Sequence, residues 1–254
     1  MCLIVFAWKV HPDYPLVVAA NRDEFRHRTA RPAHWWDDAP DVLAGRDLEA
    51  GGTWMGVTRS GRFAALTNRR DPARRATDAP SRGSLVLRAL TDDRPPVDVL
   101  ADLGADSDRY AGFNLLAGDR DTLAVHDNAS GEVRPIPPGV YGLSNARLDT
   151  PWPKLTLARA RLAEALVRMP DPEPVLALLR DDIPAPDHLL PDTGVGLEAE
   201  RRLSPIFLRD AHYGTRSSAM ILFGADGRAS LREWTWDARG EVAGEICQDF
   251  AIGH

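Results

Sequence analysis

The sequence opens with "MCLIVFAWKV", in which a cysteine directly follows the initiator methionine. Cytosolic aminopeptidases remove Met1 when the next side chain is small, so the sequence permits a free α-amine on Cys2. An α-amine has a reference pKa of about 8, and it can therefore accept the proton of a thiol on the same residue. The position predicts that Cys2 is an N-terminal nucleophile. The alternative is a half-buried structural cysteine in an edge strand.

Four further groups of polar residues lie at the ends of strand-like runs. They are "NRDE" (residues 21–24), "LTN" (66–68), "YGLSNARLDTPWPK" (141–154) and "YGTRSS" (213–218). Within the first group, Arg22 and Asp23 have two interpretations. They form a strand-end salt bridge, or they serve Cys2: Arg22 then lowers the pKa of the thiol, and Asp23 accepts a hydrogen bond from the amine.

Two asparagines and one arginine could complete such a site. Asn68 and Asn145 end strand-like runs, and their side-chain N–H groups can donate to a developing oxyanion. Asparagine is also common in turns for reasons unrelated to catalysis. Arg216 directly precedes the apolar run "SSAMILF", and its guanidinium suits a carboxylate, phosphate or thiolate. The alternative for Arg216 is a surface arginine at the end of a loop.

Composition and charge exclude several classes of function. Apolar residues make up 44% and charged residues 27% of the chain, which is typical of globular proteins. The net charge of -6 gives no support for a nucleic-acid partner. The one basic run, "NRRDPARR" (residues 68–75), is interpreted as a solvated loop because acidic residues, proline and alanine interrupt or flank it.

Metal, disulfide and membrane signals are weak. The seven histidines are scattered without metal-ligand spacing, so we expect neither a metal nor another cofactor. Two cysteines, Cys2 and Cys247, do not make a disulfide framework, which favours a cytoplasmic protein. No run approaches the roughly 20 apolar residues of a membrane span.

The elements that must position these residues are mostly strands. Strand-like runs cover residues 3–8, 16–20, 53–58, 62–67 and 218–236, and further strand signals lie in "GFNLLAG", "TLAVHDN" and "VYGLSN". Helices are predicted over residues 84–90, 95–103 and within 151–182. Because the strands come in hairpins with the helices grouped between them, we expect an α+β fold of antiparallel sheets covered by helices. Without a linker, residues 1–254 are predicted to form a single domain.

Seven segments in this order resemble the NRDE family, which is the transport and Golgi organisation 2 protein family. They are "MCLIVFAW", "VVAANRDEF", "AGRDLEAGGTWMGVTRSGRFAALTNRR", "GFNLLAGD", "YGLSNARLDTPWPK", "LPDTGV" and "YGTRSSAMIL". They extend from residue 1 to about residue 222, so the resemblance spans nearly the whole chain. That family is similar in turn to N-terminal nucleophile hydrolases of the choloylglycine and penicillin V acylase type. The resemblance implies a four-layer αββα sandwich, with two antiparallel sheets between helical layers.

The resemblance also implies a catalytic set. In the acylases an N-terminal cysteine attacks an amide, an arginine and an aspartate orient it, asparagines assist the oxyanion, and a later arginine completes the site. The matching residues are Cys2, Arg22, Asp23, Asn68, Asn145 and Arg216, and substrate contacts are expected from Asn21, Trp54, Asn114 and Ser217. The implied activity is hydrolysis of linear, non-peptide amide or related acyl bonds in a small molecule.

Two alternatives remain open from the sequence. Family members are linked to haem trafficking and to acyl-CoA or lipid metabolism, so a non-catalytic carrier is the second hypothesis. A haem carrier needs an axial ligand, which Cys2 can supply. The second alternative concerns geometry: Arg22 and Asp23 are adjacent, and adjacent strand residues point to opposite faces. Either the strand bends there, or Asn21 or Glu24 takes one of the two roles.

Overall fold

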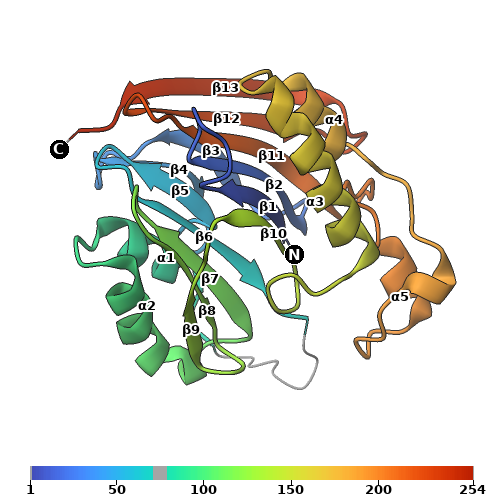
Figure 1. Ribbon diagram of the computed structural model, residues 1–254. Coiled ribbons are helices and arrows are strands. Elements are labelled where there is room, and N and C mark those ends of the chain that lie inside the picture. Colours follow the sequence, from blue (N-terminus) through green and yellow to red (C-terminus); the bar gives the residue numbers. More distant parts are fainter. Residues whose placement is uncertain (1, 71–78, 254) are drawn as a thin grey trace.

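Two antiparallel sheets form the centre of the molecule (Figure 1). The structure is a computed structural model that describes residues 2–70 and 79–253. The six-stranded sheet has the order β10 (Gly139–Leu143), β1 (Cys2–Trp8), β2 (Leu16–Phe25), β11 (Tyr213–Phe223), β12 (Arg228–Trp236) and β13 (Val242–Ala251). The seven-stranded sheet has the order β3 (Ala30–Trp35), β4 (Val42–Asp47), β5 (Met55–Thr58), β6 (Phe63–Asn68), β7 (Phe113–Gly118), β8 (Leu123–Asp127) and β9 (Glu132–Pro135).

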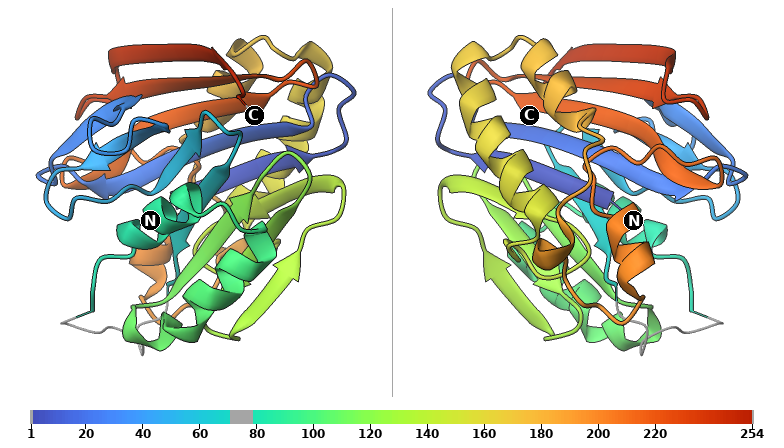
Figure 2. Two further views of the ribbon diagram at one scale, coloured as in Figure 1. Left: turned by 90° about the vertical axis from the view of Figure 1, so that its left-hand side faces the viewer. Right: turned by 90° about the vertical axis from the view of Figure 1, so that its right-hand side faces the viewer.

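Helices cover the outer face of each sheet (Figure 2). Helices α1 (Gly83–Thr91) and α2 (Pro96–Ala105) pack on the seven-stranded sheet, and α3 (Pro153–Ala165) and α4 (Glu173–Leu179) pack on the six-stranded sheet. A short helix, α5 (Leu197–Arg202), follows. The order of layers is therefore helix, sheet, sheet, helix, and the predicted αββα sandwich is confirmed.

Strand β1 shows how the sequence produces these layers. Its even-numbered residues from Ile4 to Trp8 pack in the core between the sheets, whereas its odd-numbered residues from Leu3 to Ala7 pack against α3 and α4. A strand that is buried on both faces needs a continuous apolar run, which explains "LIVFAW". Cys2 continues the even-numbered series, so its side chain lies on the inter-sheet side.

Several elements were not predicted from the sequence. Strands β3, β4, β9 and β13 and helix α5 lie outside the predicted runs. Strand β3 contains Pro32, and β13 alternates exposed and half-buried polar residues along an edge of its sheet. Edge strands have one unpaired side and need fewer apolar residues, so their pattern is weak.

The basic run at residues 68–75 is also corrected in part. Arg70 is not solvated: its guanidinium forms a buried ion pair with Glu200 of α5. Arg69 pairs with Asp127 at 2.6 Å. Residues 71–75 lie outside the described residues. Burial of Arg70 depends on α5, which is more than 120 residues further along the chain, so local composition does not reveal it.

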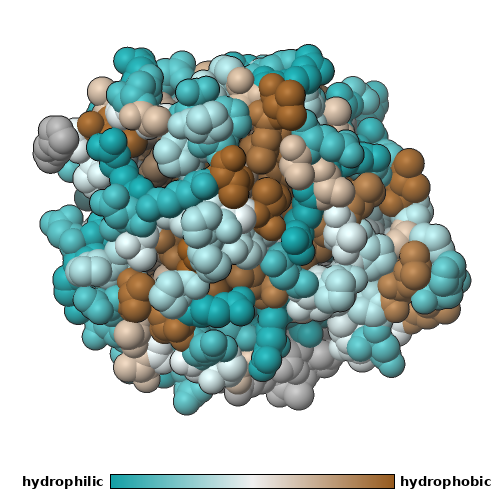
Figure 3. All heavy atoms as spheres, viewed as in Figure 1, coloured by the Kyte–Doolittle hydropathy of each residue, from teal (hydrophilic) through white to brown (hydrophobic). Residues whose placement is uncertain are grey.

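The outer surface is mostly hydrophilic on the face shown in Figure 3. The exposed large apolar side chains of the described residues are spread over separate elements, such as Leu157 on α3, Leu197 on α5 and Val242 on β13. Within residues 2–70 and 79–253, we find no helix with both the length and the apolar character of a membrane span.

A buried histidine predicts an acid-sensitive fold. His126 on β8 is 0% exposed and packs against Phe113 and Gly104. Burial lowers the pKa of His126 below its usual value of 6.5. The unfolded chain therefore takes up a proton that the folded chain resists, and stability falls as the pH drops below about 6.5, by up to about 1.4 kcal/mol per pH unit. Urea unfolding of wild type and His126→Leu from pH 7.5 to 5 should show a shallower pH dependence in the variant. Parallel profiles would contradict this prediction.

Candidate active site

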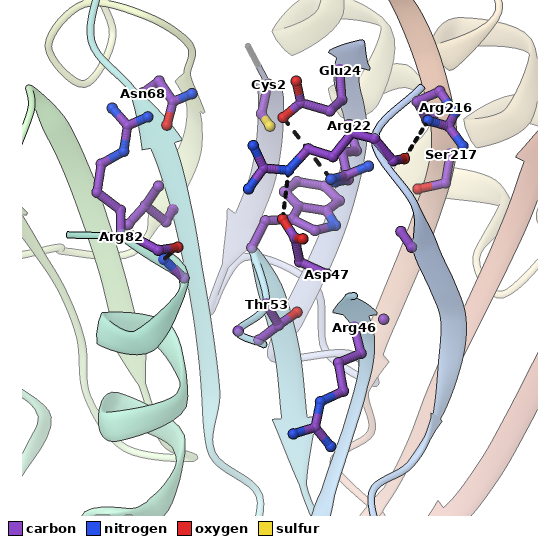
Figure 4. Close-up of a pocket in the computed structure, with 18 of the residues that line it drawn as sticks. Cys2, Arg22, Glu24, Arg46, Asp47, Thr53, Asn68, Arg82, Arg216 and Ser217 are labelled. Carbon is purple, nitrogen blue, oxygen red and sulfur yellow. Dashed lines mark hydrogen bonds and ion pairs between the residues drawn. The ribbon is translucent and has the colours of Figure 1, made fainter. Parts of the chain in front are cut away.

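A cavity of about 410 Å³ lies at the end of the inter-sheet layer where β1 begins (Figure 4). Both sheets and the start of α1 contribute to its wall. The polar and aromatic residues that line it are Cys2, Arg22, Asp23, Glu24, Arg28, Arg31, Arg46, Asp47, Thr53, Trp54, Ser81, Arg82, Asn68, Arg216, Ser217, Glu233 and Thr235. Seven of the ten residues expected from the sequence are in this set. Asn21, Asn114 and Asn145 are not among the described residues that line it.

Cys2 and Arg22 are held together by strand pairing. Antiparallel β1 and β2 place Cys2 directly opposite Arg22, and Ser217 of β11 lies opposite Arg22 on its other side. Directly opposed residues share one face of a sheet, so the three side chains lie on the cavity side. Ser144 Oγ donates a hydrogen bond to the Cys2 carbonyl oxygen at 3.2 Å, which fixes the start of the strand.

The electrostatics of the Cys2 thiol differ from the expectation. The residue is 7% exposed, and this burial raises the pKa of the Cys2 thiol. The charge of Arg22 lowers it and that of Asp23 raises it, but both effects are smaller than that of burial. Arg22 thus acts in the expected direction, but burial outweighs its effect on the thiol pKa. A thiol that stays neutral in its resting state needs a base at the moment of attack.

The four residues of "NRDE" divide between two faces of β2. Arg22 and Glu24 share the face of Cys2, with Arg22 Nη2 at 4.0 Å from Glu24 Oε2. Asn21 points the other way: its side-chain amide donates to the carbonyl oxygens of Leu179 (2.8 Å) and Ile206 (2.9 Å) beneath the helical layer. Asn21 therefore links β2 to the segments that cover it, outside the cavity.

Asp23 also points toward the helical layer, yet it remains close to the cavity wall. Its Oδ1 accepts a hydrogen bond from Thr215 Oγ1 at 2.8 Å. Burial raises the pKa of the Asp23 carboxyl, and the nearby Lys154 ammonium opposes that shift. Burial in turn lowers the pKa of Lys154 to about 8, and its Nζ donates to the Leu203 carbonyl at 3.0 Å. The Asp23 carboxyl and the Lys154 ammonium thus form a buried polar group on the helical side of the sheet, near the first residues of β1.

The three asparagines have different surroundings. Asn68 ends β6 and lines the cavity, and its side-chain amide has no hydrogen-bond partner within residues 2–70 and 79–253. Asn145 is 1% exposed, and its Nδ2 donates to the Asn68 carbonyl at 2.8 Å. Asn114 Nδ2 donates to Thr67 Oγ1 (3.1 Å) and to the Ala146 carbonyl (2.8 Å). Asn145 and Asn114 therefore fix the strand end that carries Asn68.

Arg216 stabilises the loop that follows β2. It lies in a β-bulge of β11, between Thr215 and Ser217. Its Nη1 donates to the carbonyl oxygens of Phe25 (2.9 Å), Arg26 (3.1 Å) and Arg28 (2.9 Å). Three carbonyls on one guanidinium nitrogen hold the loop in place and so position Arg28.

Six charged residues of the cavity were not predicted from the sequence: Arg28, Arg31, Arg46, Asp47, Arg82 and Glu233. Arg28 Nε donates to Asp47 Oδ2 at 2.7 Å. Glu233 Oε1 accepts from the Ala33 amide at 2.8 Å, and burial raises the pKa of this carboxyl. One signal for Glu233 exists, because it continues the inward-facing series of Ala229 and Leu231 on β12. Among the described residues, no group of three or more acidic, histidine or cysteine side chains is placed to hold a metal ion.

The layering is that of the N-terminal nucleophile hydrolases. A structure of the C2A mutant of conjugated bile acid hydrolase from Clostridium perfringens matches with a TM-score of 0.52 and 8% identity, covering 100% of this chain and 97% of that chain. At this identity the likeness concerns the fold.

The family follows from sequence similarity. The family model described as Transport and Golgi organisation 2 matches residues 1–238. The Transport and Golgi organization protein 2 homolog of Bos taurus is 38% identical over 260 residues, covering 92% of each chain. The Homo sapiens homolog is 36% identical over 256 residues with the same coverage. The chain therefore belongs to the Transport and Golgi organisation 2 family, which confirms the resemblance.

Proposed function

We propose that this protein is a cytoplasmic N-terminal nucleophile hydrolase that cleaves linear amide or related acyl bonds, with Cys2 as the nucleophile. The observation that carries the proposal is the position of Cys2. It begins strand β1, opens onto a cavity large enough for a small molecule, and lies directly opposite Arg22. The fold is shared with a hydrolase whose matched structure carries an alanine in place of the cysteine at its own second position.

In the proposed reaction the α-amine of Cys2 is the base. After Met1 is removed, the amine takes the thiol proton as sulfur attacks the carbonyl carbon of the substrate. Asn68 donates to the oxyanion of the tetrahedral intermediate, and the protonated amine then returns its proton to the leaving nitrogen. This step gives an acyl-thioester on Cys2 and a free amine. Water attacks the thioester and releases the acid, which restores the thiol.

The surrounding charges support this division of roles. Burial keeps the thiol neutral at rest, so a base on the same residue suits the step. Asp23 lies behind the start of β1, where we assign it the positioning of the amine. Arg22, on the cavity face, stabilises the thiolate as it forms. Asn145 acts through Asn68 by holding its carbonyl.

Processing of the chain provides the first test. Protein made in a bacterial cytosol is expected to lack Met1, because Cys2 has a small side chain. Intact-mass measurement of the purified protein decides this directly. Full retention of Met1 in active protein would exclude the α-amine of Cys2 as the base.

An acyl adduct provides the decisive test. The processed protein is incubated with a library of linear N-acyl amides, quenched in acid and measured by intact mass, with the adduct then located by peptide mapping. We expect acylation at Cys2 and none at the exposed Cys247. Tight binding of haem or an acyl-CoA without any adduct would instead favour the carrier hypothesis.

A further inference from the structure

Arg82 is a cavity residue that the proposed reaction does not use. It directly precedes α1, and two glycines fix this backbone against the loop before β5. A Cβ on Gly52 would lie 2.5 Å from the Gly83 carbonyl carbon, so position 52 does not tolerate a side chain. The Thr53 amide donates to the Gly83 carbonyl at 3.3 Å. The position of Arg82 in the cavity wall is therefore rigidly set.

The guanidinium of Arg82 has no acidic partner among the described residues. Its Nη1 donates to the Gly112 carbonyl at 3.0 Å, and within residues 2–70 and 79–253 no carboxylate lies within ion-pair distance of it. Burial lowers the pKa of Arg82, whereas the negative charge of Glu24 opposes that shift. In Figure 4 the side chain extends toward Asn68 on the opposite side of the cavity from Arg216. A partly desolvated cation thus lies beside the proposed oxyanion donor.

Three other arginines of the same cavity are already bound. Arg28 Nε donates to Asp47 Oδ2 at 2.7 Å. Arg46 donates two hydrogen bonds of 2.7 Å to the Asp38 carboxylate, and Asp38 is not one of the residues that line the cavity. Arg216 donates to three backbone carbonyls. These guanidinium groups have a structural role, whereas the remaining donors of Arg82 are available to a bound molecule.

We propose that Arg82 binds a carboxylate carried by the substrate, so that the site selects acyl amides with an anionic group close to the scissile bond. That the bound molecule is a substrate rests on the function proposed above. A planar guanidinium matches a carboxylate through two parallel hydrogen bonds.

The test measures binding without turnover. In a Cys2→Ala background, isothermal titration compares succinamic acid with succinamide, which have nearly the same shape and differ in one carboxylate. We expect the acid to bind about ten- to 100-fold more tightly, the range for a charge-assisted hydrogen bond. Arg82→Gln should abolish the preference. Arg88→Gln, the matched change at an exposed position of the same helix, should retain it. Equal affinities in the parent, or a preference that survives Arg82→Gln, would overturn the proposal.

A second variant tests whether a change in binding results from misfolding. Arg82→Lys keeps the charge but not the planar pair of donors, so a reduced preference is expected at an unchanged melting temperature. An undiminished preference would also refute the role of Arg82. Because the titration needs no catalysis, the two proposals can fail separately. A carboxylate preference without any acyl adduct would contradict the hydrolase proposal and support the anion site at Arg82. An acyl adduct without the preference would support the hydrolase proposal and contradict the anion site.

Discussion

Replacement of Cys2 by alanine is expected to lower the turnover of an acyl amide at least about 1,000-fold, because the nucleophile itself is removed. The affinity for the same ligand should change little, since the cavity wall loses a single sulfur atom. The measurement is kcat on a substrate found by the adduct screen, together with the dissociation constant from titration. Retained turnover in this variant would exclude Cys2 as the nucleophile.

Two comparisons separate the thiol from the amine. Cys247→Ala changes an exposed cysteine on β13 and should leave turnover unchanged. Insertion of one alanine between Met1 and Cys2 keeps the thiol but moves the free amine to another residue. This variant should lose turnover nearly as completely as Cys2→Ala. If it stays active, another group in the cavity acts as the base, and the buried Glu233 carboxyl becomes the first candidate.

The sequence predicted the sheets well because their apolar patterns are strong. Strand β1 is buried on both faces, and the hairpin of β5 and β6 has a clear turn, so composition alone located them. Edge strands such as β13 have exposed side chains along much of their length, and their pattern resembles that of a loop. The alternation of side chains along β2 predicted that Arg22 and Asp23 point to opposite faces of the strand. Only the register with β1 shows that Arg22 is the residue opposite Cys2.

The site was predicted less completely, and the reason is side-chain direction. Residue type and strand-end position identified Asn68 and Asn145 alike. In the structure one amide lies in the cavity wall, and the other donates to a backbone carbonyl. Arg82 gave no local signal, because its place depends on the close approach of Gly52 and Gly83 across the fold. Contacts between segments that are distant in sequence decide these roles, and a single sequence does not contain them.

The second large effect is expected from Asn68→Ala, which should lower turnover about 100- to 1,000-fold, the range for loss of one oxyanion donor. Its hydrogen bond matters mainly in the transition state, so ligand affinity should remain nearly constant.

The melting temperature distinguishes this role from a structural one. Within the described residues the Asn68 side chain makes no hydrogen bond, so its removal should leave the thermal midpoint nearly unchanged. Asn145→Ala is the matched control. It removes the bond to the Asn68 carbonyl and leaves a partly buried acceptor without this donor, so it should lower the melting temperature as well as turnover. If Asn68→Ala instead lowers stability and activity together, Asn68 only holds the end of β6. Unchanged turnover at unchanged stability would remove Asn68 from the mechanism, and the oxyanion donor would have to be sought among the other groups of the cavity wall.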